Sequence, residues 1–133
     1  MKHLVLLSLL LLSITFASPA NVKHAALFEP YVKYQKSWIN RYRVYKGNAP
    51  AQARLMREML AKKAEYESKL GKDLGEYAVK HKSLCVTAFL YTAMSFDNLM
   101  FWAGDYRQGQ DNPSLFKTEI RKAETGIRDC KAL

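Results

Sequence analysis

The chain has few of the residues that interrupt helices or carry metal and redox chemistry. Its 133 residues include only 6 glycines, 4 prolines, 2 cysteines and 3 histidines. The two cysteines form no Cys-x-x-Cys motif, which argues against redox catalysis and against covalently attached haem. The Gly-x-Ser-x-Gly nucleophile motif is also missing. We therefore expect a protein that is not an enzyme and holds no metal and no cofactor.

The remaining chemical candidates are weak. His24 lies near an expected frayed start, and His81 stands between two lysines whose charge disfavours a metal ion. Met94 and Met100 have side chains that can ligate haem, but methionine in an apolar helix is more often core. Asp97 lies in the most apolar segment, so we expect a buried carboxylate paired with a cation or bonded to a tyrosine. A functional acid is the alternative for Asp97.

The first 20 residues predict a secretory signal peptide. A basic start precedes the apolar run Leu4–Phe16, and small residues follow. Cleavage is expected after Ala17 or Ala20, which leaves a single domain over 21–133. The alternative is an uncleaved membrane anchor, but about 13 apolar residues are too few to span a bilayer.

The expected mature chain is strongly basic. Without Lys2 it has 20 Lys and Arg against 12 Asp and Glu, a net charge of about +8. Such a charge favours an acidic protein partner or an anionic lipid, although it can also serve solubility alone. Nucleic acid is not expected, because an exported protein has little access to it.

Cys85 and Cys130 are expected to form one disulfide, because an even pair in an oxidising compartment is usually bonded. Two free thiols are the alternative. No Asn-x-Ser/Thr glycosylation site occurs in the sequence. A bacterial periplasm is therefore a simpler destination than a eukaryotic secretory route that glycosylates its proteins.

The hydrophobic pattern predicts helices throughout the mature chain. Four segments show apolar residues at steps of three and four: 22–46, 50–70, 73–103 and 113–130. Short connections between them predict an all-α fold, a small antiparallel four-helix bundle with the disulfide Cys85–Cys130. The run Leu84–Phe96 carries no charge and predicts a central buried helix. A membrane span is the alternative, but Asp97 directly after the run counts against it.

Two surfaces are candidates for partner binding. Residues Gly104–Asn112 are expected to form a loop after the third helix. Trp, Tyr and Arg, which occur in and beside this loop, are residue types enriched at binding hot spots. The candidate contact residues in and beside this loop are Trp102, Asp105, Tyr106, Arg107, Gln108 and Gln110. The second surface is the basic face of the first helix, with Lys33, Lys36 and Arg43. The alternatives are that the loop is only a polar connection between helices, and that the basic face of the first helix is only solvated.

These features together predict an exported, non-enzymatic binding protein. The most concrete version is an inhibitor or immunity protein that occludes a secreted toxin or cell-wall hydrolase. Its size, export, helicity and single disulfide are similar to the general plan of helical periplasmic immunity proteins, without a motif that assigns the chain to one. The alternatives are an envelope chaperone or lipid-binding protein, and a secreted membrane-active or host-directed factor.

Overall fold

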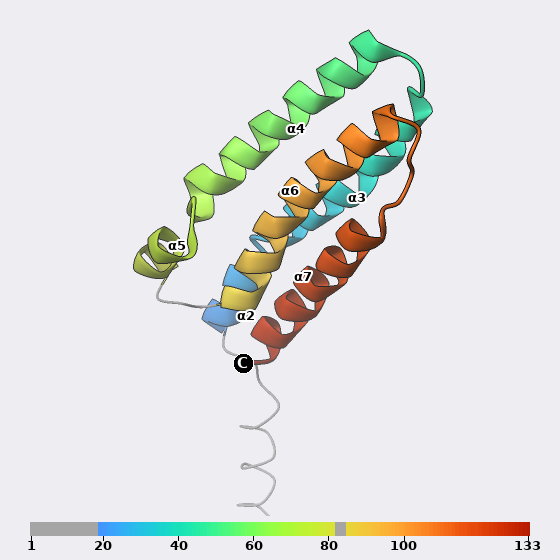
Figure 1. Ribbon diagram of the computed structural model, residues 1–133. Helices are drawn as coiled ribbons and strands as arrows, with labels where there is room; N and C mark the ends of the chain where they lie inside the picture. Colours follow the sequence, from blue (N-terminus) through green and yellow to red (C-terminus); the bar gives the residue numbers. More distant parts are fainter. Residues whose placement is uncertain (1–18, 82–84) are drawn as a thin grey trace, which may run out of the picture.

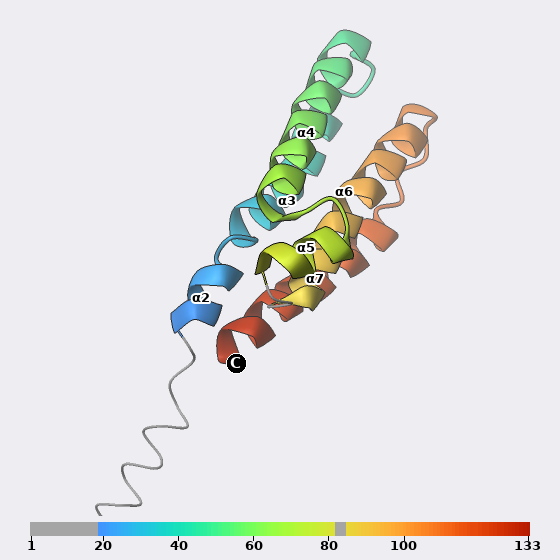
Figure 2. The same ribbon diagram turned by 90° about the vertical axis from the view of Figure 1, so that its left-hand side faces the viewer.

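The computed structural model describes residues 19–81 and 85–133, and this part of the chain folds into helices without strands (Figure 1). The helices are α2 (Pro19–Ala25), α3 (Glu29–Val44), α4 (Ala49–Leu70), α5 (Leu74–His81), α6 (Val86–Arg107) and α7 (Ser114–Ala132). Two views show α3, α4, α6 and α7 lying side by side along one direction (Figures 1 and 2). The expected leader over 1–20 lies outside the described residues, apart from Pro19 and Ala20 in α2.

The aromatic stripe of α3 faces the core, as its spacing predicts. Tyr31, Trp38 and Tyr42 are buried, while Tyr34 and Tyr45 are half-buried at its margin. The indole Nε1–H of Trp38 donates to the carbonyl of Leu55 on α4 at 2.9 Å, so the ring is held both by packing and by a hydrogen bond.

The segment predicted as one helix over 22–46 is two helices. α2 ends at Ala25, and a turn over 26–28 leads into α3, which begins at Glu29. Pro30 explains the break, because a proline lacks the N–H that a continuous helix needs and fits the first turn of a new one.

The caps of the following helices agree with the sequence. The Asn48 side chain accepts from the Ala51 N–H at 3.1 Å beside Pro50, and α4 ends before Gly71. Asp73 accepts from the Glu76 N–H at 2.8 Å and so caps the start of α5.

The segment predicted as one helix over 73–103 is also divided, into α5 and α6. Cys85 has φ 55°, in the left-handed region, so an α-helix cannot pass through it. Cys85 is bonded to Cys130, as predicted, with 5.2 Å between the Cα atoms. The disulfide therefore joins the start of α6 to the end of α7.

The close packing of α6 on α7 depends on Gly126. A Cβ at this position would lie 2.7 Å from the Ala88 backbone nitrogen and 3.0 Å from Thr87. The predicted inner stripe of α7 is confirmed, since Phe116, Ile120, Ala123, Ile127 and Cys130 are all buried. α7 begins one residue later than expected, at Ser114. The Ser114 N–H donates to Asn112 Oδ1 at 3.2 Å.

The uncharged run in α6 is buried on its inner side only. Ala88, Phe89 and Phe96 are buried there, whereas Met94 on the other side is 44% exposed. Across 19–81 and 85–133, no helix combines the length and apolarity that crossing a membrane requires.

Candidate functional site

A groove runs between α3 and α7. Two adjoining hollows form it, of about 680 Å³ and about 600 Å³, and both are lined by Lys36, Asn40 and Glu124. Its floor is apolar, because the inner stripes of the two helices meet beneath it at Val32, Ile39, Phe116, Ile120 and Ile127. We call this feature the α3–α7 groove.

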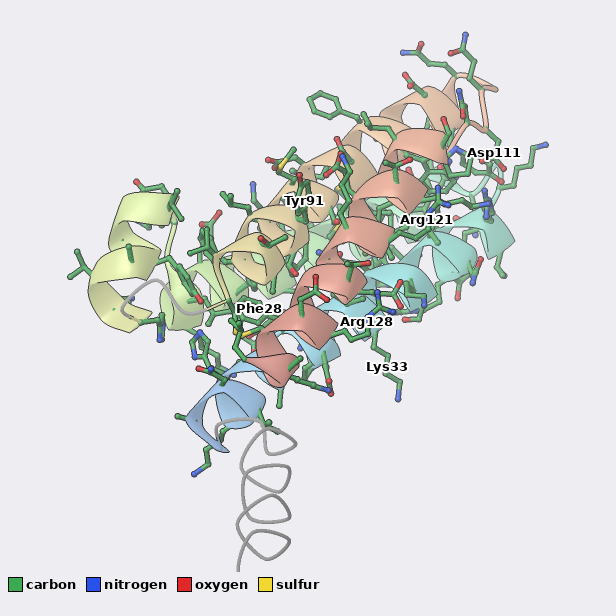
Figure 3. The ribbon with its side chains drawn as sticks, turned by 90° about the horizontal axis from the view of Figure 1, so that it is seen from below. Phe28, Lys33, Tyr91, Asp111, Arg121 and Arg128 are labelled. Carbon is green, nitrogen blue, oxygen red and sulfur yellow. A yellow bond between two sulfur atoms is a disulfide. The ribbon has the colours of Figure 1, made fainter. Side chains whose placement is uncertain are left out.

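Cationic side chains dominate the walls of the α3–α7 groove. They are Lys33, Lys36, Arg43, Lys117, Arg121, Arg128 and Lys131, against the carboxylates Glu29 and Glu124. Figure 3 shows Arg121 and Arg128 on the side of α7 that faces α3 and Lys33. On α7 these cations extend over about 21 Å, at 1.5 Å per residue from Lys117 to Lys131.

Two ion pairs cross the groove in a heptad register. Glu29 pairs with Lys131, and Lys36 Nζ lies 3.4 Å from Glu124 Oε2. Each partner in the second pair lies one heptad from its counterpart in the first, so the two helices run in opposite directions here. One more heptad along each helix gives Arg43 and Lys117, which have the same charge.

Asp111, from the loop before α7, neutralises this end of the groove. Its carboxylate accepts from Arg43 Nε at 3.0 Å, from Arg43 Nη2 at 2.8 Å and from Trp102 Nε1 at 2.9 Å. These hydrogen bonds, first from Arg43 and then from Trp102, lower the pKa of Asp111, and the positive charge of Lys117 adds to the effect. This end of the groove is therefore built to hold a carboxylate.

Four of the cations that line the groove have no ion pair within the described residues: Lys33, Lys117, Arg121 and Arg128. Unpaired cations beside an apolar floor produce a positive potential where a partner can also bury apolar surface. Such an arrangement can attract carboxylates and bury apolar side chains at the same place.

The structure corrects the expected loop over Gly104–Asn112. α6 continues to Arg107, so Asp105, Tyr106 and Arg107 are helical. The Tyr106 ring stacks on Trp102 with 4.9 Å between centroids, and its hydroxyl donates to the Arg43 carbonyl at 3.3 Å. The stacking within α6 and the hydrogen bond to α3 stabilise the last turn of α6 beyond Gly104.

The predicted contact residues therefore differ in what they offer a partner. Asp105, Arg107, Gln108 and Gln110 are exposed, and Tyr106 is half-buried. Trp102 is only 3% exposed, so it supports Asp111 from beneath and does not present its own ring.

The two predicted surfaces meet in space. Lys33, Lys36 and Arg43 all line the α3–α7 groove, and Arg43 also binds the loop through Asp111. Sequence reasoning missed the opposite wall, whose residues on α7 recur at steps of four and three: Lys117, Arg121, Glu124, Arg128 and Lys131. This periodicity in the sequence could have indicated that these charged residues share one face of the helix.

Asp97 is not buried, contrary to expectation. Its side chain is 54% exposed and pairs with Lys63 Nζ at 3.0 Å. The pairing was expected, but the carboxylate lies at the exposed margin between α6 and α4 and not in the core.

His24 is not frayed. Its Nε2 shares a hydrogen bond of 2.8 Å with the Tyr77 hydroxyl, and its ring lies 4.8 Å from that of His81. Burial lowers the pKa of His24, and the neighbouring His81 lowers it further. In the parts of the chain that the structure describes, no three His, Cys, Asp or Glu side chains gather as metal ligands would.

No family model, curated protein or solved structure matches this chain.

Proposed function

We propose that this chain is an exported, non-enzymatic binding protein that holds an acidic protein segment in the α3–α7 groove. The observation that carries the proposal is the set of unpaired cations, Lys33, Lys117, Arg121 and Arg128, around an apolar floor. Its concrete form is an inhibitor or immunity protein that occludes a secreted toxin or cell-wall hydrolase. The four long helices serve it as an antiparallel four-helix bundle, a rigid frame for the two walls.

The charges inside the groove favour a protein over a polyanion. Glu124 lies at its middle and Glu29 at one end, and Asp111 pairs with Arg43 at the other end. These carboxylates interrupt the row of cations, so a uniformly anionic ligand such as a polynucleotide or a lipid surface cannot use the whole length of the groove. A protein segment with acidic residues and an occasional basic residue matches the mixed pattern.

Export is supported by two independent features. The N-terminal residues have the three-part pattern of a cleaved leader. The Cys85–Cys130 disulfide is of the kind that persists in oxidising compartments such as the periplasm or the extracellular space.

The experiment is an affinity capture from envelope extract and culture medium of the organism that makes the protein. Three oxidised baits are compared: the unmodified protein, a groove variant with Lys33→Glu, Arg121→Glu and Arg128→Glu, and a matched control. The control carries Arg54→Glu, Arg57→Glu and Lys72→Glu, which change the net charge equally at exposed positions outside the groove.

The proposal expects one protein, in near-equal amount, on the unmodified and control baits but not on the groove variant. Equal retention on all three baits would place the binding surface elsewhere. Retention of lipid without protein would support the lipid-binding alternative instead.

A further inference from the structure

The outer side of α6 presents exposed apolar side chains, and no helix of the described residues covers it. Residues at steps of four and three share this face: Thr87, Tyr91, Met94, Asn98, Phe101 and Asp105. Phe101 is 71% exposed, and Leu115 of the neighbouring α7 is 58% exposed. We call these residues, with Lys122, the α6 outer face.

This exposure conflicts with the composition of α6. Residues 86–96 carry no charge, and a helix that is apolar on all sides is normally covered on all sides. Here α7, α3, α4 and α5 cover only the inner sides. In Figure 1, α6 lies in front of α3, so the uncovered face is turned toward the reader.

The α6 outer face is separate from the α3–α7 groove. Figure 3 shows Tyr91 on the side of α7 opposite to Lys33, Arg121 and Arg128. An occupant of one surface therefore leaves the other accessible.

The charges at the two ends of this face are opposite. Asp105 lies at one end, and Lys122 lies near the other, with its Nζ 5.1 Å from the centre of the Tyr91 ring. Neither side chain has an ion pair in the described part of the chain. A surface with one charge at each end can complement a copy of itself that is turned around.

We propose that a second copy of this chain covers the α6 outer face, in a two-fold dimer with the two α6 helices running in opposite directions. An axis between Met94 and Asn98 sets Phe101 of one copy against Tyr91 of the other. It also brings Asp105 toward Lys122 of the second copy. Phe101 supplies the buried apolar anchor, and the charge pair fixes the direction.

The size of this face suits a weak, reversible interface. From Thr87 to Asp105 it covers 18 residue steps, about 27 Å at 1.5 Å per residue. With α7 beside it at about 9 Å the face is about 20 Å wide. Its projected area of roughly 540 Å² per partner lies in the range of weak complexes, which bury less than about 1,200 Å² in total.

A membrane surface fits the same face less well. Helices that lie on membranes carry lysines and arginines beside the apolar face, which attract anionic lipid. The α6 outer face carries one cation, Lys122, and one carboxylate, Asp105, so it lacks the row of cations that attracts anionic lipid.

The dimer also has a functional consequence, which rests on the proposed function of the α3–α7 groove. Two copies of the groove make the protein bivalent, which strengthens binding to a clustered partner.

Sedimentation equilibrium of the oxidised, exported protein tests the proposal. The unmodified protein is expected to dimerise reversibly, and Phe101→Glu to weaken the dimer at least about tenfold, because it buries an unpaired charge. Val79→Glu is the matched control, since Val79 is 86% exposed on α5 and lies outside the face. The control should dimerise like the unmodified protein, and circular dichroism should show all variants folded.

Charge exchange supplies the second arm. Asp105→Lys and Lys122→Asp are each expected to weaken the dimer about threefold to tenfold, and the double variant to restore it. A protein that stays monomeric, a dimer unaffected by Phe101→Glu, or single variants without rescue in the double variant would each overturn the proposal. Binding of the monomer to phosphatidylglycerol vesicles, lost in Phe101→Glu, would assign the face to a membrane instead.

Discussion

Arg43 of α3 and Asp111 of the loop before α7 form a bidentate ion pair, with Nε–Oδ2 at 3.0 Å and Nη2–Oδ1 at 2.8 Å. The guanidinium carbon of Arg43 also lies 5.2 Å from the centre of the Trp102 ring. One arginine thus fixes the loop, covers a buried tryptophan and forms the end of the α3–α7 groove.

Replacement of Asp111 by Asn should lower the free energy of unfolding by about 0.5–1 kcal/mol at neutral pH, the scale of a well-formed surface pair. Because the pKa of Asp111 is lowered in the folded state, its stabilisation is present above the ordinary pKa of 3.8. It is lost as the pH falls through the lowered pKa. Urea denaturation at neutral and strongly acidic pH measures the difference between the two proteins. Asp129→Asn is the control, because Asp129 is exposed on α7 and has no ion pair with any described residue. Equal effects of both variants would contradict the prediction.

The contact of His24 with Tyr77 and His81 should make stability depend on pH near neutrality. The folded pKa of His24 lies below 6.5, so the unfolded chain binds its proton more readily. Stability should therefore decrease as the pH falls below 6.5 toward the lowered pKa. Urea midpoints between about pH 5 and pH 7.5 measure this slope, and His24→Gln should reduce it. An unchanged slope in His24→Gln would assign the dependence to another group.

Replacement by alanine at two helical glycines should change the free energy of unfolding in opposite directions. Gly126→Ala should destabilise by about 1–3 kcal/mol, because its Cβ would lie 2.7 Å from the Ala88 backbone nitrogen. Gly104→Ala meets nothing within 4 Å and should stabilise α6 by about 0.5–1 kcal/mol. Urea denaturation of both variants checks the pair. A stabilising Gly126→Ala would show that α6 and α7 can separate at no cost.

Loss of the disulfide should cost about 3–4 kcal/mol in the chain-entropy estimate, since the bond closes a loop of 45 residues. The comparison is between the oxidised protein and the double variant Cys85→Ser, Cys130→Ser, by urea denaturation. Addition of a reductant should reproduce the loss in the unmodified protein and change nothing in the double variant. Equal stability of oxidised and serine proteins would mean that packing alone fixes the start of α6 to the end of α7.

The sequence predicted those features that depend on neighbours along the chain. The aromatic stripe of α3 and the apolar stripe of α7 follow from helical periodicity. The cap of α5 likewise depends on near neighbours, because Asp73 accepts from the Glu76 N–H three residues away. The disulfide was also predictable, because only two cysteines exist.

The break before α3 had a local signal in Pro30, which the expectation of one helix over 22–46 overlooked. The break at Cys85 was harder to predict, because apolar spacing continues across it and nothing local marks its left-handed backbone. The sequence likewise did not determine that Trp102 is buried and Asp97 exposed. Residue type alone does not say which side of a helix packs against another helix.

By itself, therefore, the sequence determined an all-helical chain, the residues on each inner stripe and the pairing of its cysteines, since these follow from local periodicity and from counting. Only the tertiary structure decided that Lys33 and Lys36 face Arg121 and Arg128 across one groove, and that Arg43 binds Asp111. Such contacts depend on the register of α3 against α7, which is set by long-range packing of side chains far apart in the chain.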